Sequence, residues 1–278
     1  MFSINEIQRP KVLLLKDSGL GIAETAARTC YNSFDKSNNK IIQDFNVDFN
    51  QSNLNDLNII NDSPLLERLT WATQHHSILE HITFSFYIEG ISRGVLQEHA
   101  RHRIQSISVK STRYTMSNIL YAFLSSMTIL RSKNWFISKI LEFDMFVINN
   151  KPFQMLLISQ IWDKLYMYWK EDKNQFLEVT LSKDNLNGYL NNNLESENMY
   201  QFFIKNKSKR NVGDNFKTIV DDNWKTDMVC TFNLRSLKNY LSLRDSGAAY
   251  YQIKILAEEI KKVIPKKYFP LIIKNFKD

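Results

Sequence analysis

The amino-acid sequence predicts a protein of the α/β (α+β) class, because several regions have clear and different periodicities. In HITFSFYI (81–88), apolar residues alternate with polar ones, which is the period of a strand with one buried face. KVLLL (11–15) is a short apolar run that favours a buried strand. Further along the chain, 233–245 and 248–264 place apolar residues three and four positions apart, as amphipathic helices do.

The first elements of the chain are a strand and a helix. The strand at 11–15 is followed by an alanine-rich stretch (22–31) that predicts a short helix. Residues 32–63 are rich in Asn, Asp and Ser, which indicates a loop with room for one short helical piece. Ser63 and Pro64 then begin a helix over 64–76, because serine is a good N-cap and proline fits the first turn.

The alternating strand comes next. We expect one face of 81–88 to be buried, namely Ile82, Phe84, Phe86 and Ile88, and we expect Gly90 to end the strand. A helix then runs from Ser92 toward Arg101.

The stretch EHARHRIQSISVKSTRY (98–114) concentrates cations, histidines and hydroxyls. At the C-terminal end of a helix, Arg101, His102 and Arg103 would complement the helix dipole, which is a purely structural explanation. It does not account for the hydroxyls that follow. In an extended segment Ser111 and Arg113 point the same way, and a guanidinium beside a hydroxyl would make a phosphate cradle. From the residues alone, both explanations stay open.

The rest of the chain contains helical patterns. Residues 119–210 hold apolar helical stretches separated by polar tracts. In NLRSLKNYLSLRD (233–245) one side is apolar, with Leu234, Leu237, Tyr240 and Leu241. The polar positions are Asn233, Arg235, Asn239, Ser242 and Arg244. Gly247 interrupts the pattern, and 248–264 form a long amphipathic helix.

Composition limits the class of protein. A chain of 278 residues that is 44% hydrophobic is typical of a globular protein. No apolar run approaches the roughly 20 residues that span a bilayer, and the two cysteines, Cys30 and Cys230, form no CxxC pair. We therefore expect a cytoplasmic protein with reduced thiols. The net charge of +7 favours anionic partners: nucleic acid, acidic lipid or phosphorylated small molecules.

Several common chemistries lack their motifs. The histidines at 75–81 and 99–102 do not have the HExxH or CxxC spacing of zinc sites, so no metal site is predicted. Cys30 and Cys230 are interpreted as small buried thiols rather than nucleophiles. GxSxG, P-loop and GxGxxG motifs are absent from the sequence, which disfavours the familiar hydrolase, NTPase and dinucleotide-binding folds.

One long motif resembles a known family. Arg101-His102-Arg103, seven further residues and Ser111 form an RHR-x7-S motif, completed by STRY, that resembles the flavin-dependent thymidylate synthases. AARTCYNS (26–33), SILEH (77–81) and TFNLRSLKNYLSLR (231–244) agree with the family in the same order. The resemblance covers most of 11–118 and 211–264. It implies a mixed sheet flanked by helices in a single domain over 1–278, with a helical insertion around 119–210.

The resemblance also implies an activity. Members of the family transfer a methylene group from 5,10-methylenetetrahydrofolate to dUMP and reduce it with a hydride from FADH2, which NADPH regenerates. The anionic charge of all these ligands suits a basic chain. The resemblance also implies a homotetramer whose sites are shared between subunits. The expected partners are the small-molecule substrates, and neither nucleic acid nor a membrane is expected.

Particular residues match the family's site. The resemblance assigns the flavin to Arg101, His102, Arg103, Val109, Asn233, Arg235 and Asn239, with His81 and Thr83 approaching from a neighbouring subunit. It assigns dUMP and its phosphate to Glu98, Arg101, Lys110, Ser111, Arg113, Lys217 and Arg244. Arg244 would be the catalytic residue, placed over the uracil where negative charge develops at N3. No metal is implied. Val109 stands where the family is often polar, and Val220-Asp221 replaces a usual Leu-Pro pair.

Two other functions remain as alternatives. A non-catalytic nucleic-acid binder would use the basic cluster and surface lysines, and its binding would weaken steeply with salt. An inactive relative would retain flavin while the long central segment blocks a site.

Overall fold

The structure is a computed structural model that describes residues 9–44, 57, 60–111, 222 and 225–276. The chain divides into two compact units. One comprises Met1–Gln8, Gly90–Gly94 and Lys110–Thr226, and the other comprises Arg9–Glu89, Val95–Val109 and Asp227–Asp278. Most described residues belong to the second unit. The predicted helical insertion lies outside the described residues, so it stays a prediction.

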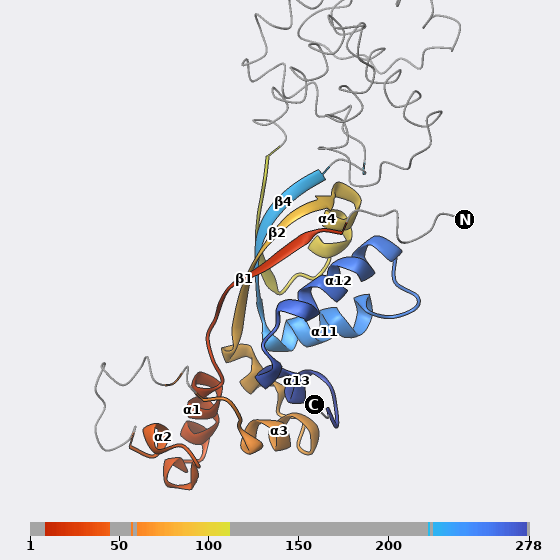
Figure 1. Ribbon diagram of the computed structural model, residues 1–278. Coiled ribbons are helices and arrows are strands. Elements are labelled where there is room, and N and C mark those ends of the chain that lie inside the picture. The colour runs from red at the N-terminus through yellow and green to blue at the C-terminus, as the bar shows by residue number, and fades with distance from the viewer. Residues whose placement is uncertain (1–8, 45–56, 58–59, 112–221, 223–224, 277–278) are drawn as a thin grey trace, which may run out of the picture. The chain divides into compact units, whose positions relative to one another are not determined.

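A four-stranded sheet forms the centre of the fold (Figure 1). Its strands are β1 (Lys11–Asp17), β2 (Thr83–Ser92), β3 (Gln105–Val109) and β4 (Lys225–Asn233), in the order β1-β2-β4-β3. The β1–β2 and β3–β4 pairs are antiparallel. The predicted alternation in β2 is confirmed, since Ile82, Phe84, Phe86 and Ile88 are all fully buried. The strand does not end at Gly90, however, but passes through it with a φ of 79°.

The first strand differs from its prediction in burial. β1 forms, but Leu13 and Leu15 are 44% and 56% exposed, so the expectation of a buried strand was wrong for these residues. Successive side chains of a strand point to opposite faces of the sheet, so Leu13 lies on the face opposite the buried Val12. Leu15 lies where the register to β2 shifts, between Leu14 and Lys16, and has no partner residue in β2.

Short helices follow β1. They are α1 (Gly21–Cys30), the 3-10 turn η2 (Phe34–Lys36), α2 (Lys40–Asp44), α3 (Pro64–Trp71) and the 3-10 segment η4 (His76–His81). The predicted N-cap is confirmed, because the Ser63 hydroxyl accepts a hydrogen bond from the Leu66 amide. The helix was expected to reach residue 76 but ends at Trp71. Gln74 adopts a φ of 57°, a left-handed conformation that an α-helix cannot include.

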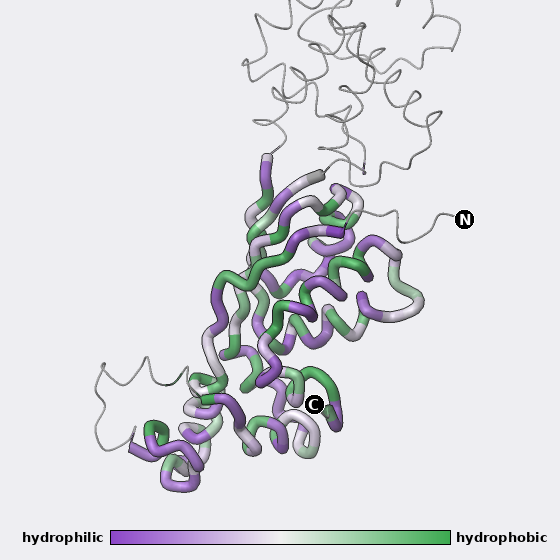
Figure 2. Tube along the Cα trace, in the orientation of Figure 1, coloured by the Kyte–Doolittle hydropathy of each residue, from purple (hydrophilic) through white to green (hydrophobic). Residues whose placement is uncertain are grey.

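The remaining helices are α4 (Arg93–Ala100), α11 (Leu234–Arg244), α12 (Tyr251–Val263), η5 (Lys266–Tyr268) and α13 (Phe269–Ile272). In α11 the predicted apolar side is buried. Asn233 caps this helix by accepting a hydrogen bond from the Ser236 amide at 2.8 Å. α11 packs against η4 and α12, and α12 packs against β1. Figure 2 shows apolar stretches along the strands and along these two helices. The predicted α/β class, with helices flanking a sheet, is confirmed.

The two cysteines have different environments. Cys230 is buried in β4, as predicted, and burial raises the pKa of its thiol to about 12. Cys30 is exposed, so its prediction as a buried thiol was wrong. It is the last residue of α1, where the chain turns away from the buried Ala23 and Ala27.

Candidate active site

The Arg-His-Arg sequence forms a tight turn between α4 and β3. The His99 carbonyl accepts two hydrogen bonds, from the His102 amide at 3.1 Å and from the Gln105 side-chain amide at 2.8 Å. Arg101 follows the end of α4 directly, so the helix-dipole explanation fits the structure as well. The turn has a second role, because it presents its side chains toward the end of another helix.

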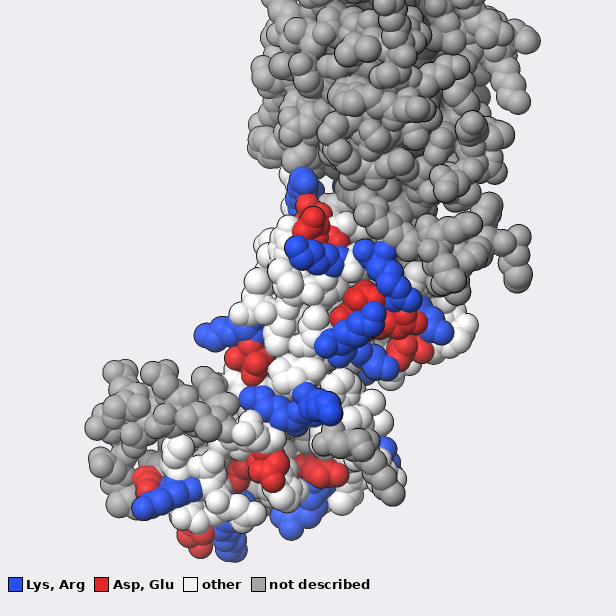
Figure 3. All heavy atoms as spheres, in the orientation of Figure 1, with Lys and Arg blue, Asp and Glu red and all other residues white. Residues whose placement is uncertain are grey.

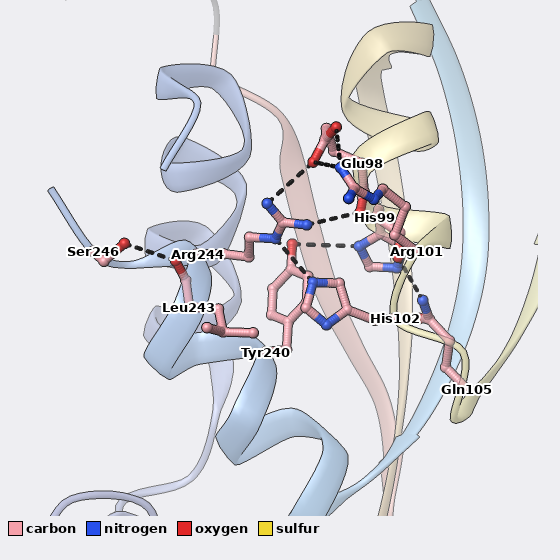
Figure 4. A network of polar contacts seen from close by, with 9 residues as sticks. All are labelled: Glu98, His99, Arg101, His102, Gln105, Tyr240, Leu243, Arg244 and Ser246. Carbon is pink, nitrogen blue, oxygen red and sulfur yellow. Dashed lines mark hydrogen bonds and ion pairs between the residues drawn. The ribbon is translucent and has the colours of Figure 1, made fainter. Parts of the chain in front are cut away.

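That helix is α11, whose last residue, Arg244, is the centre of a polar network (Figure 4). The Arg244 Nε donates to His102 Nε2 at 2.9 Å, and one terminal nitrogen donates to the Glu98 carbonyl at 3.3 Å. The other terminal nitrogen lies 3.1 Å from the Glu98 carboxylate. The same carboxylate pairs with Arg101 at 3.1 Å. Glu98 therefore holds two guanidinium groups close together, and the Arg244 side chain is only 17% exposed.

The network fixes the protonation of His102. A guanidinium can only donate, so His102 Nε2 accepts and the imidazole is neutral with its proton on Nδ1. The pKa of His102 is lowered, first by burial and then by the positive charges of Arg244 and Arg101, while Glu98 opposes the shift. The site thus combines two exposed or half-buried cations with a neutral hydrogen-bonding ring.

An open hollow of about 700 Å³ lies beside this network. Its walls come from the Arg-His-Arg turn, one face of α11 and the segment after α11. The lining residues are Arg101, His102, Arg103, Ile104, Ser236, Asn239, Leu243, Arg244, Ser246, Ala248 and Ala249. Five of the predicted site residues line it: Arg101, His102, Arg103, Asn239 and Arg244. Glu98 is not a lining residue, but it forms ion pairs with Arg101 and Arg244, which are.

Other predicted residues lie at the opposite end of α11. Asn233 is the N-cap, and Arg235 forms an exposed ion pair with Glu80 at 2.6 Å. His81 and Thr83 lie in the same neighbourhood, since the Leu234 amide donates to the Ile82 carbonyl between them at 2.7 Å. This helix of 11 residues is about 16 Å long, so the structure brings the predicted residues together in two groups rather than one.

The remaining predicted residues are near or beyond the end of β3. Val109 is the last residue of that strand and is exposed. Lys110 and Ser111 are described but belong to the other unit of the chain. Arg113, Lys217 and the Val220-Asp221 pair lie outside the described residues.

Sequence reasoning missed several residues of the site. Ile104, Ser236 and Leu243 line the hollow, and the small residues Ser246, Ala248 and Ala249 form another wall. Ser236, Asn239 and Leu243 recur at helical spacing on one face of α11, which is the signal that could have found them. The buried Tyr240 and His99 behind the network had no signal beyond an apolar pattern.

Three further observations concern the described residues outside this hollow. On the face drawn in Figure 3, basic and acidic side chains of the described residues lie side by side. Within the described ranges, no group of three or more His, Cys, Asp or Glu could hold a metal ion. No helix in this part of the chain is long and apolar enough to cross a membrane.

Known proteins similar to this chain identify its family. The family model described as thymidylate synthase complementing protein matches residues 13–271. The flavin-dependent thymidylate synthase of Wolinella succinogenes is 29% identical over 264 residues, which cover 95% of this chain and 98% of the relative. That of Campylobacter jejuni is 28% identical over 258 residues, covering 93% of both chains.

A solved structure agrees. The crystal structure of thymidylate synthase X from Helicobacter pylori, with FAD and dUMP, matches with a TM-score of 0.60 and 25% identity, covering 95% of this chain and 97% of that one. Since the family model spans nearly the whole sequence, the chain belongs to the flavin-dependent thymidylate synthase family.

Proposed function

We propose that this chain converts dUMP to dTMP, taking the methylene group from 5,10-methylenetetrahydrofolate, with FAD as cofactor and NADPH as its reductant. The observation that carries the proposal is the convergence of Arg101, His102, Arg103, Asn239 and Arg244 on one hollow, in a chain of this family. The first three come from one turn and the last two from a helix more than a hundred residues later.

The residues of the hollow fit a flavin. Pockets for small molecules and cofactors measure about 300 to 1,000 Å³, and the hollow is about 700 Å³. FAD has a flat apolar ring and an anionic pyrophosphate. Ile104 and Leu243 offer apolar contact, and Arg101 and Arg103 offer guanidinium groups that bind phosphate well. We assign His102 and Asn239 to the polar edge of the ring. When bound, the reduced flavin supplies the hydride.

The substrate is assigned to the basic groups beside the flavin. Arg101, Glu98 and Arg244 are connected by ion pairs, so an entering anion meets two guanidinium groups that are already oriented. We assign dUMP and its phosphate also to Lys110, Ser111, Arg113 and Lys217. These assignments follow from the family's motif.

Arg244 is proposed as the catalytic residue. Its Nε is anchored by His102 and its terminal nitrogens by Glu98, so its planar charge has a fixed direction. A fixed cation stabilises negative charge that develops on the uracil ring in the transition state, because it needs no reorganisation during the reaction.

The second group of residues supports a shared site. We propose a homotetramer in which His81, Thr83, Asn233 and Arg235 contribute to the flavin site of a neighbouring subunit, with Val109 near the cofactor. Their separation from the hollow along α11 and the exposure of His81, Thr83 and Arg235 leave this group accessible to a neighbouring subunit. The free thiols of Cys30 and Cys230 support a reducing compartment, and we place the enzyme in the cytoplasm.

The test combines a spectrum with an assay. The purified protein should be yellow with flavin absorption, and should release tritium from 5-tritiated dUMP only when NADPH and methylenetetrahydrofolate are both present. A colourless protein that instead binds duplex DNA with steep salt dependence would contradict the proposal. Flavin without turnover would identify an inactive relative.

A further inference from the structure

Behind the Arg244 network lies a layer of buried rings to which the proposed reaction assigns no role. Tyr240, His99 and Phe232 are all fully buried. The Tyr240 ring lies edge-on to His102, with centroids 4.8 Å apart, and edge-on to His99 at 5.2 Å. Figure 4 shows Tyr240 beside both imidazoles. Tyr240 therefore connects the buried layer to the side chains that line the hollow.

The polar atoms of this layer are compatible with one arrangement of protons. The Tyr240 hydroxyl lies 3.3 Å from His99 Nδ1. Burial raises the pKa of Tyr240 and lowers that of His99, so the phenol keeps its proton and the imidazole is neutral. We assign the hydroxyl as the donor to Nδ1, which places the ring proton of His99 on Nε2.

Two unsatisfied atoms complete this arrangement. Within the described part of the chain, His99 Nε2 and Gln105 Oε1 are both buried without a hydrogen-bond partner. The first is the donor that the Tyr240 bond requires, and the second is an acceptor. Gln105 already donates to the carbonyl of the same histidine at 2.8 Å. The Gln105 amide nitrogen thus donates to the His99 carbonyl, and its amide oxygen is an acceptor that would complement the His99 Nε2 proton.

We propose that Tyr240 is a positioning residue for the reaction. Its ring holds His102, and its hydroxyl holds His99, whose carbonyl in turn accepts from the amide of His102 in the Arg-His-Arg turn. The inference rests on the proposed function, because its consequence for catalysis passes through Arg244, which His102 anchors at 2.9 Å.

The hydroxyl is the informative group to remove. Tyr240→Phe keeps the ring but leaves His99 Nδ1 without its donor in a fully buried place. A buried polar atom without a partner is costly, so His99 should shift, and the turn and Arg244 should shift with it. A displacement of about 1 Å at a distance from the reacting atoms can lower the rate about a hundredfold.

The experiment compares two buried tyrosines in the full-length protein. Tyr240→Phe should stay folded and retain flavin, while kcat falls about ten- to hundredfold with a much smaller change in KM for dUMP. Tyr268→Phe is the matched control. Tyr268 is also fully buried, its hydroxyl hydrogen bonds to Asp17, and it does not line the hollow. This control should lose stability but keep both kinetic constants.

A second readout does not depend on activity. In an NMR titration of the protein as purified, the imidazole of His102, assigned with His102→Gln, should titrate closer to the ordinary value of about 6.5 in Tyr240→Phe than in the parent protein. Unchanged kcat and an unchanged titration would overturn the inference. If the parent protein has no turnover but the titration still moves, the proposed function fails while the positioning of His102 stands.

A further variant keeps the inference testable when Tyr240→Phe does not fold. If Tyr240→Phe does not fold, His99→Phe removes the other partner of the same hydrogen bond, and the same loss of kcat is expected. Wild-type kcat in a folded His99→Phe protein would then overturn the inference.

Discussion

The two ends of helix α11 are built differently. At the C-terminal end, Arg244 is bound by His102 and Glu98 and is supported from behind by the buried Tyr240 and His99. At the N-terminal end, Arg235 and Glu80 form an ion pair whose side chains are 54% and 47% exposed. The first end is organised before any ligand arrives. At the second end, the side chains of Arg235 and Glu80 remain largely exposed to solvent.

This difference suggests a division of work. An enzyme needs its charge-stabilising group fixed in advance, because reorganisation during the reaction costs rate. Groups that only bind a cofactor tolerate more freedom. We therefore propose catalysis at the buried end and a contribution across a subunit boundary at the exposed end.

The largest expected effect is at the buried end. Arg244→Ala should remove about 2.7 to 4 kcal/mol of transition-state stabilisation and lower kcat about a hundred- to a thousandfold. The protein should remain folded and yellow, which can be measured by circular dichroism and the visible spectrum. Turnover within tenfold of the parent protein would contradict the assigned role.

The second effect is the loss of unfolding free energy at acid pH that the buried His99 should cause. The pKa of His99 is lowered to about 3 in the folded protein, mainly by burial, against about 6.5 when unfolded. The unfolded chain therefore binds more protons between these values, so stability falls as pH drops below about 6.5. Between pH 7 and 4.5 this histidine alone should account for about 2.5 kcal/mol of lost unfolding free energy.

The matched variant for this test is His99→Phe, which keeps an aromatic ring but cannot be protonated. Urea titrations at several pH values should show a smaller loss of unfolding free energy for the variant than for the parent protein. Equal losses would show that His99 is not kept neutral by burial.

A smaller effect concerns the contact between His102 and Arg244. The pKa of His102 is below its ordinary value, so the ring is neutral at pH 7 and accepts from Arg244. As pH falls through that pKa, the ring gains a proton and two donors face each other. We expect kcat/KM for dUMP to fall about tenfold per pH unit below it.

The pH profile needs a control, because a phosphate group also titrates near pH 6. In His102→Gln the side-chain oxygen can accept from Arg244 at every pH, so only the limb due to the phosphate should remain. An identical acid limb in both proteins would exclude His102 as its source.

The smallest effect on stability is expected at the exposed end. Arg235→Ala breaks a solvent-exposed ion pair and should change the free energy of unfolding by less than about 0.5 kcal/mol. Flavin retention should nevertheless decrease if the residue serves a shared site. Lys262→Ala, which breaks the ion pair of an exposed lysine with Glu259, is the control and should leave flavin retention unchanged.

Local patterns explain how far the fold was predictable. The burial of Phe84 and Phe86 and of the apolar side of α11 follows from the spacing of apolar residues in the sequence, and both predictions were confirmed. The exposure of Leu13 and Leu15 was not predictable, because an apolar run reveals neither which face of its strand is covered nor where the register to the next strand shifts. The early end of α3 depended on the conformation of Gln74, a residue with no strong preference for it.

The site was predictable in its parts but not in its connections. The RHR-x7-S motif identified the turn, and the pattern in 233–245 identified the helix. The hydrogen bond between Arg244 and the Glu98 carbonyl joins positions 146 residues apart, and no sequence periodicity predicts such a contact. The hydroxyl of Tyr240 was invisible for a similar reason, since in the sequence it counts only as an apolar ring.

The most direct measurement is a structure of the protein crystallised with FAD and dUMP. We predict that the isoalloxazine ring lies in the hollow beside Ile104 and Leu243, with the uracil against it and the Arg244 guanidinium within hydrogen-bonding distance of the pyrimidine. If both ligands instead bind elsewhere while Arg244 keeps only its contacts to His102 and Glu98, the central claim is contradicted.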